Sequence, residues 1–222
     1  MALISQNFEG GSNGAVITTG NSGGVSGDAF TSVTNLSFSS AQAAHGILSG
    51  LASSSAAAAL PTTGAASNGV GYVRMYLWVT GTTTTERVLG LNDTTGFFFG
   101  ARLNASQLQL MTFNGSTSNY YTQGTTTLPA NQWVRVEVAV RHAASLEARL
   151  YTTLDSFTAT ETITQTLGTG TDAWSSVVIN TPTGSYIDDL AWTDVNWLGP
   201  VLEPPPRPIS VNARAAQRAS RW

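Results

Sequence analysis

Two segments of the chain alternate apolar and polar residues with a period of two, which predicts β-strands. In 71–80 the aliphatic residues are Val73, Met75, Leu77 and Val79, and between them stand Tyr72, Arg74, Tyr76 and Trp78. In 132–142 the apolar positions are Val134, Val136, Val138 and Val140, and between them stand Trp133, Arg135, Glu137 and Arg141. Period two sends successive side chains to opposite faces of a sheet. We therefore expect each aliphatic set to face a core. The intervening set should face solvent or a groove in the first strand, and solvent in the second.

Shorter runs of the same kind predict further strands at 15–19, 29–30, 35–39, 86–91, 96–103, 107–113, 146–152, 161–166, 175–180 and 185–192. Turn-type sequences separate them, among them Asn114-Gly115, a strong hairpin signal. The Ala-rich stretch 41–60 is ambiguous, because alanine also has the best helix propensity. Its all-β surroundings favour a strand followed by an irregular loop. Short strands at this spacing predict an all-β protein, an antiparallel β-sandwich.

Composition changes at the end of the predicted sandwich. Residues 1–200 form the sandwich in this interpretation, and 201–222 form an extended Pro/Arg-rich C-terminal arm. The arm contains three successive prolines and carries Arg207, Arg214, Arg218, Arg221 and Trp222. We expect it to bind a neighbouring chain, with bidentate arginine contacts and an apolar anchor at Trp222. Four arginines in a chain of net charge −3 argue against a nucleic-acid partner.

The chain as a whole is poor in charge and has no cysteine. Charged residues make up 10% of it, against about 25% in a typical domain. A surface of neutral polar residues suits packing against neighbours or binding neutral polar ligands. The absence of cysteine excludes disulfides and thiolate metal sites. No secretory signal pattern stands at the start, and 41–60 contains too many polar residues for a convincing membrane span. We therefore expect no membrane partner.

No catalytic constellation is visible. Gly20-Asn21-Ser22-Gly23-Gly24 matches the pattern G-x-S-x-G, but that motif requires a following helix, and no helix signal follows here. The two histidines, His45 and His142, have no partner at metal-ligand spacing. We therefore expect a protein that is not an enzyme.

Two groups of residues are candidates for binding. Glu9 would approach Asp188 and Asp189 if the first and last strands pair, and carboxylates brought together require a cation such as Ca²⁺ or a hydrogen-bond network. The alternative is that Asp188 or Asp189 bonds to backbone amides at a strand end while Glu9 is solvated. The second group, Tyr72, Tyr76 and Trp78, could stack on sugar rings, as could Tyr120-Tyr121 on a loop. The alternative for these rings is sheet packing or a subunit interface.

The two ends of the predicted sandwich carry a family resemblance. Phe8-Glu9-Gly10, the distant Tyr186-Ile187-Asp188-Asp189-Leu190, and Trp133-Val134-Arg135-Val136-Glu137 resemble the concanavalin A-like/laminin-G-like jelly-roll superfamily. The ends are also similar to those of jelly-roll carbohydrate-binding modules, where an acidic residue near each end often holds a structural Ca²⁺. The resemblance implies Glu9 and Asp189 as the ligands here.

Domains of this kind recur among the virion proteins of tailed phages. The resemblance therefore implies a non-enzymatic structural protein of a phage virion, in capsid decoration or as a minor tail protein. Its C-terminal arm would dock on copies of itself or on other virion proteins. The alternative is a carbohydrate-binding module that mediates attachment to host-surface glycans.

Overall fold

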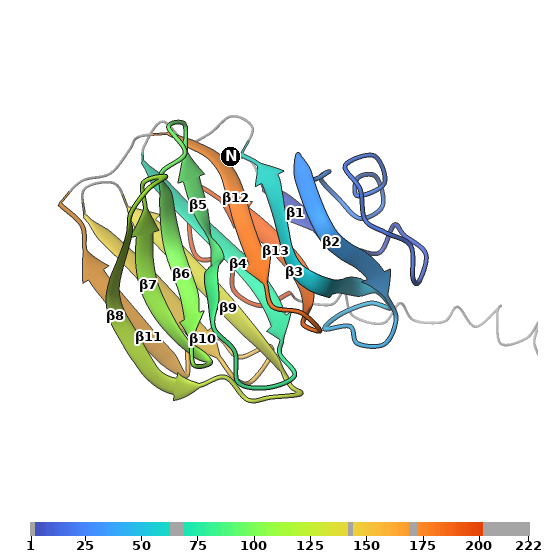
Figure 1. Ribbon diagram of the computed structural model, residues 1–222. Coiled ribbons are helices and arrows are strands. Elements are labelled where there is room, and N and C mark those ends of the chain that lie inside the picture. Colours follow the sequence, from blue (N-terminus) through green and yellow to red (C-terminus); the bar gives the residue numbers. More distant parts are fainter. Residues whose placement is uncertain (1–2, 63–68, 142–143, 169–172, 202–222) are drawn as a thin grey trace, which may run out of the picture.

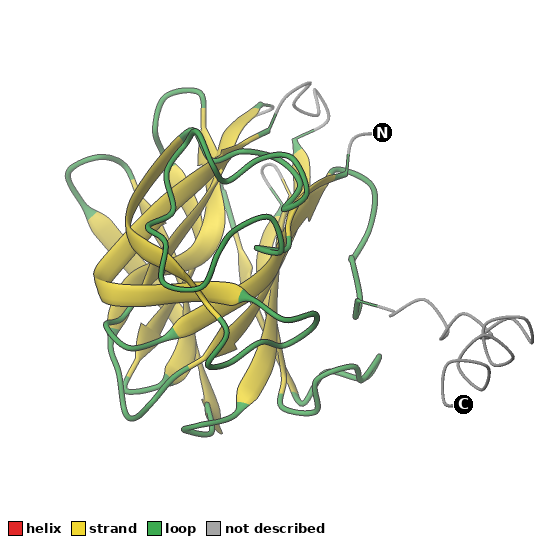
Figure 2. Cartoon of the chain, turned by 90° about the vertical axis from the view of Figure 1, so that its right-hand side faces the viewer, coloured by secondary structure: helices red, strands yellow, loops and turns green. Residues whose placement is uncertain are grey.

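The computed structural model describes residues 3–62, 69–141, 144–168 and 173–201, and it is all-β. None of these residues is helical, so none belongs to a helix that could cross a membrane (Figure 2). The strands are β1 (Ile4–Gln6), β2 (Ser32–Ser39), β3 (Ser49–Pro61), β4 (Val70–Trp78), β5 (Thr85–Asp93), β6 (Phe98–Asn104), β7 (Gln107–Phe113), β8 (Ser118–Thr127), β9 (Trp133–Arg141), β10 (Ser145–Tyr151), β11 (Glu161–Thr166), β12 (Trp174–Thr181) and β13 (Tyr186–Thr193).

The strands form two packed layers, as the sandwich prediction required (Figure 1). One layer has the order β11-β10-β9-β4-β13, and the other has the order β3-β12-β5-β6-β7-β8. All pairs are antiparallel, and β13 also pairs with β3, which joins the layers along one side. The first and last strands pair as expected, with Ile4 opposite Trp192. This arrangement confirms the antiparallel jelly-roll sandwich.

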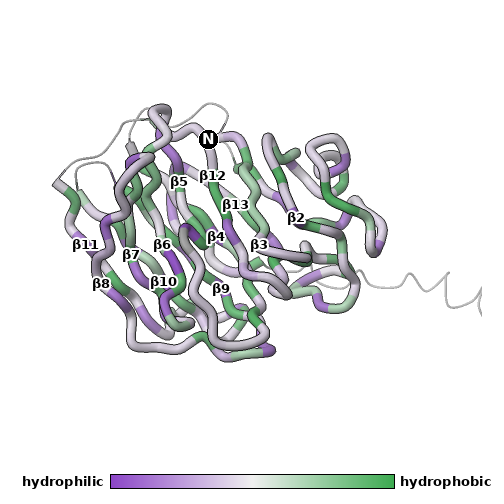
Figure 3. The backbone as a smooth tube through the Cα atoms, in the orientation of Figure 1, coloured by the Kyte–Doolittle hydropathy of each residue, from purple (hydrophilic) through white to green (hydrophobic). Residues whose placement is uncertain are grey.

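The core lies between the two layers, because the period of two sends the aliphatic side chains of each strand to its inner face. Val73, Met75 and Leu77 of β4 are buried in one apolar cluster, together with the four alternate valines of β9. Apolar positions recur along the strands of both layers, with polar positions between them (Figure 3). Burial of these aliphatic faces against each other is the main stabilising contribution of the fold.

Glu161 links β11 and β8, the edge strands of the two layers, on the side away from the β13–β3 pair. Glu161 of β11 accepts hydrogen bonds from the backbone N–H groups of Thr125 (2.6 Å) and Thr126 (3.1 Å) of β8. Thr122 Oγ1 also donates to the carbonyl of Thr164 at 3.3 Å. These bonds satisfy edge groups that would otherwise be available to another chain.

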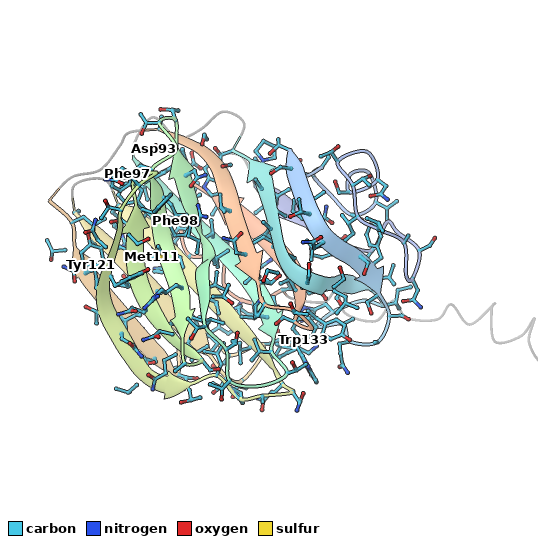
Figure 4. The ribbon with its side chains drawn as sticks, viewed as in Figure 1. Asp93, Phe97, Phe98, Met111, Tyr121 and Trp133 are labelled. Atoms are coloured by element: carbon cyan, nitrogen blue, oxygen red, sulfur yellow. The ribbon has the colours of Figure 1, made fainter. Side chains whose placement is uncertain are left out.

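The turn between β5 and β6 is built around a second carboxylate. Asp93 Oδ1 accepts hydrogen bonds from the backbone N–H groups of Thr95 and Phe97, both at 2.8 Å. Phe97, labelled beside Asp93 in Figure 4, in turn stacks on Phe99. A short polar side chain that bonds to the backbone following it is the usual reason for aspartate in turns.

The Ala-rich stretch differs from its prediction. The strand does not come first: residues 40–48 form the irregular part, and β3 then runs through the alanines from Ser49 to Pro61. β2 pairs with one edge of β3, and β12 and β13 pair with the other. Hydrogen bonding on both edges outweighs the helix propensity of alanine, which is a weak preference.

Three other local predictions were wrong. Tyr120 and Tyr121 lie in a strand, β8, and not on a loop. Residues 15–19 contribute one isolated bridge, between Val16 and Ser37, and 29–30 form no strand. These N-terminal segments instead pack as irregular chain beside β2, where Phe30 reaches the core.

Candidate functional site

The outer face of the β13-β4-β9-β10 layer carries rows of polar and aromatic side chains. Strand register places Asp188, Tyr76, Arg135 and Tyr151 side by side in one row across the four strands. The next row contains Arg74, Glu137 and Arg149. Opposite charges on adjacent strands attract, and the sheet brings them together although they are far apart in sequence.

Part of this face is covered by the chain itself, which corrects the expectation of a solvent-exposed face on β9. Arg135 and Glu137 are fully buried. Arg135 donates to the carbonyls of Leu154 (2.9 Å) and Ser156 (2.7 Å), and its Nε lies 2.8 Å from Oε1 of Glu137. Burial raises the pKa of Glu137, against the attraction of Arg135 and Arg74. A buried ion pair needs such additional hydrogen bonds to be tolerated.

Residues 194–201, called the C-terminal segment below, cover another part of the same face. Two buried side chains of β4 hold it. Arg74 donates from Nη1 to the carbonyl of Gly199 at 3.0 Å, and the backbone N–H of Val201 donates to the hydroxyl of Tyr76 at 2.9 Å. The segment carries Trp197, and these two bonds fix where that ring lies.

The acidic residues of the predicted Ca²⁺ site accept hydrogen bonds from backbone N–H groups of one loop. Glu9 accepts from the backbone N–H groups of Ile47 (3.0 Å) and Leu48 (2.9 Å). Asp188 accepts from those of Ala44 (2.9 Å) and His45 (3.3 Å). These N–H groups point positive charge at the carboxyl groups of Glu9 and Asp188, and Ca²⁺ binding stays a prediction from the sequence. Within the described part of the chain, no three His, Asp or Glu side chains gather in a way that could hold a metal ion.

Asp189, the other predicted ligand, is paired with a histidine. Its Oδ2 lies 2.6 Å from Nδ1 of His45, and Nε2 of His45 lies 3.3 Å from Asp155. The hydrogen bond to Asp189 raises the pKa of His45, although burial opposes it. Burial and the charge of Asp189 raise the pKa of Asp188 to about 8. The cluster therefore forms the hydrogen-bond network that was the alternative to a cation.

The three aromatic residues predicted to stack on sugars do not form one exposed platform. Tyr76 is completely buried, and its ring lies edge-on to His45. Trp78 is half-buried against Trp133, the first residue of β9, which is labelled in Figure 4. Tyr72 is 8% exposed, and its ring meets Trp197 at a centroid distance of 5.4 Å. Tyr72 differs from the other two because its ring contacts Trp197, which lines the pocket described below.

Trp197 is the centre of a half-exposed cluster, called the Trp197 site below, that also contains Tyr72, Arg141, Glu147 and Arg149. The guanidinium of Arg149 lies 3.8 Å from the centroid of the indole. Glu147 holds both arginines, with Oε1 2.8 Å from Arg149 and Oε2 3.3 Å from Arg141. The side chains of Arg141 and Arg149 remain 30% and 29% exposed.

Trp197 also lines a pocket of about 350 Å³, called the first pocket. Its other lining residues are Leu3, Thr193, Val195, Asn196 and Leu198. A mostly apolar cavity with a few polar groups at its edge is the usual form of a small-ligand site. Sequence patterns missed it because Trp197 lies outside every strand, and its partners come from β4, β9 and β10.

Other predicted residues stand apart from this site. Arg207, Arg214, Arg218, Arg221 and Trp222 of the arm lie outside the described residues, as does His142. Ser22 is buried and accepts a hydrogen bond from the backbone N–H of Phe30, so it is not an exposed nucleophile. Tyr120 is 46% exposed on the opposite layer, where Arg102 lies 3.7 Å over its ring.

Comparison with known proteins identifies relatives by fold alone. No family model and no curated protein matches the sequence. Among solved structures, the chain is similar to a protein of unknown function from Shewanella oneidensis MR-1, with a TM-score of 0.55 and 15% identity over 86% of this chain and 84% of that one. It is less similar to domain 4 of the arabinanase AbnA from Geobacillus stearothermophilus, in complex with arabinotriose (TM-score 0.49, 12% identity, 87% and 81% covered). The VIP36 exoplasmic/lumenal domain gives the same score and identity, with 90% and 92% covered. At 15% identity, the likeness to the Shewanella protein concerns the fold alone.

Proposed function

We propose that this domain binds carbohydrate at the Trp197 site and catalyses no reaction. The observation that carries the proposal is the position of Trp197, which lines the first pocket and lies beside the ion-paired Arg141, Glu147 and Arg149. A sugar ring offers an apolar C–H face for an indole, and hydroxyl groups around its rim. Thr193 and Asn196, which line the same pocket as Trp197, offer donors and acceptors for those hydroxyls.

The site is also held rigidly, which favours binding. Glu147 fixes both guanidinium groups, and Arg149 and Tyr72 support the indole. Side chains already ordered before a ligand arrives lose little entropy when it binds. The neutral, charge-poor surface of the chain agrees with an uncharged polar ligand.

The proposal gives His45 no catalytic role. Its two ring nitrogens face the carboxylates of Asp189 and Asp155, and not a hydroxyl that it could activate. A general base needs its substrate's proton within hydrogen-bond reach.

The proposal is tested by screening the full chain on an array of neutral glycans and titrating the best binder by calorimetry. Trp197→Ala should weaken binding by about tenfold or more, which corresponds to about 1.4 kcal/mol. Tyr120→Ala, which removes a half-exposed ring from the opposite layer, is the matched control and should leave the affinity unchanged. Equal loss in both variants, or no binding by the wild type, would overturn the proposal.

The role in a phage virion stays a prediction from the sequence. It depends on the arm, residues 201–222, of which Val201 alone lies among the described residues. A carbohydrate-binding domain on a virion would serve host attachment, so the two roles are compatible. Cosedimentation of the full chain and of a chain ending at Val201 with purified virions would test the predicted docking, which requires the full chain to bind and the shorter chain to fail.

A further inference from the structure

The hairpin turn between β7 and β8 carries an Asn-Gly pair at its exposed tip. The sequence contains three such pairs, Asn13-Gly14, Asn68-Gly69 and Asn114-Gly115. In a pair of this kind the backbone nitrogen of the glycine can attack Cγ of the asparagine, because the glycine has no β-carbon to hinder the approach. Asn68 lies outside the described residues, so the structure distinguishes the other two pairs.

The attacking nitrogen is engaged in one pair and open to solvent in the other. The N–H of Gly14 donates to the carbonyl of Phe38 at 2.8 Å. The N–H of Gly115 donates to no acceptor in the described part of the chain, and residues 114–117 are all exposed. Attack requires this nitrogen to give up its proton. At Gly14 a hydrogen bond must break first, which raises the barrier there.

The side-chain amides of the two asparagines also differ. Oδ1 of Asn114 accepts hydrogen bonds from the backbone N–H of Ser116 (3.1 Å), the hydroxyl of Ser116 (3.1 Å) and the backbone N–H of Thr117 (2.8 Å). Attack on Cγ turns Oδ1 into an oxyanion, and donors already aimed at an oxyanion stabilise it. Oδ1 of Asn13 instead accepts from the N–H of Ser40 (3.0 Å), which draws that amide toward a segment 27 residues later.

From these contacts we infer that Asn114 is a site of spontaneous deamidation, and that in the folded protein it reacts faster than Asn13. The nitrogen of Gly115 forms a bond to Cγ of Asn114, the bond from Cγ to Nδ2 breaks, and the proton lost by the Gly115 nitrogen leaves with Nδ2 as ammonia. Water then opens the cyclic imide to aspartate or isoaspartate. Either product places a carboxylate on the layer opposite the Trp197 site.

The experiment incubates the full chain at pH 7 and follows both asparagines by peptide mass mapping, with isoaspartate as the signature of the cyclic imide. Asn114 should react about tenfold faster than Asn13 or more, because its barrier is lower. In the chain held unfolded in guanidinium chloride the two rates should become similar. Equal rates in the folded protein, or the same ratio in the unfolded chain, would overturn the inference.

Two variants of the hairpin test the contacts to Oδ1. Ser116→Ala removes the hydroxyl donor and should slow the reaction of Asn114 by about fivefold, as expected for one hydrogen bond. Thr117→Ala keeps the backbone N–H that bonds to Asn114 and is the matched control, with an unchanged rate. A thermal melt shows that each variant is folded. A folded Ser116→Ala protein that reacts as fast as the wild type would contradict the inference.

Discussion

The imidazole of His45 lies 2.6 Å from the carboxylate of Asp189, a residue 144 positions later in the chain. This contact ties the irregular segment 40–48 to the last strand, β13. Glu9 and Asp188 fasten the same segment through its backbone N–H groups. The acidic residues near the two ends of the sandwich therefore anchor a loop.

This cluster predicts that stability falls as pH rises. The pKa of Asp188 is raised from 3.8 to about 8, so the folded state holds a proton that the unfolded state has released between those values. The pKa of His45 is also raised, so stability falls further as pH rises above 6.5, the ordinary value for histidine. Stability falls as pH rises wherever the folded state binds more protons than the unfolded state. The melting temperature should fall between about pH 5 and pH 8, and Asp188→Asn should flatten that decline. A melting temperature that rises over this range would contradict the assignment.

Tyr76→Phe tests how the C-terminal segment is held. The change removes the hydroxyl that accepts the N–H of Val201 and leaves the ring against His45. Loss of the bond to Val201 and of the longer bond that the hydroxyl donates to Asp155 (3.4 Å) should lower the free energy of unfolding by about 1–2 kcal/mol. Hydrogen exchange in 195–201 should become faster, and glycan affinity should fall because Trp197 is less firmly placed. Tyr186→Phe makes the same change on β13 and is the control.

Gly100→Ala tests a close contact between β5 and β6. A Cβ at residue 100 would lie 2.4 Å from the carbonyl oxygen of Leu89 and 2.6 Å from Cζ of Phe98. The backbone of Leu89 cannot move away easily, so overpacking should lower the free energy of unfolding by about 1–3 kcal/mol. Gly81→Ala is the control, since a Cβ there meets nothing within 4 Å. Chemical denaturation of both variants measures the difference.

Glu161→Gln tests the closure between β11 and β8. Burial by itself would raise the pKa of Glu161, but hydrogen bonds from Thr125 and Thr126 outweigh it and lower the pKa. A lowered pKa means that the folded state gains stability above pH 4.5 and loses it as pH falls through the folded value. The glutamine variant should exchange the amide protons of Thr125 and Thr126 faster at pH 7. At pH 3 it should differ less from the wild type, and an equal difference at both values would argue against the carboxylate's role.

The strands themselves follow from the sequence. Alternation in 71–80 and 132–142 specifies both the strands and their core faces. A one-residue slip would turn the polar side chains of the strand toward the apolar core. The runs at 107–113 and 161–166 match β7 and β11 exactly. Pairing of the two ends was also predicted, although β1 lies at Ile4–Gln6, before the residues that suggested it.

The candidate site was decided by tertiary structure. Alternation assigns Arg135 and Glu137 to the side away from the core, but it does not reveal that residues 152–160 and the C-terminal segment cover that side. It assigns Tyr76 and Tyr72 to the same face. It does not show that the hydroxyl of Tyr76 binds the backbone of Val201, or that the ring of Tyr72 contacts Trp197. The sequence by itself determined which residues form strands and which faces are apolar, since these depend on local periodicity. Only the folded chain determined which polar residues meet, because those contacts join strands and loops that are distant in sequence.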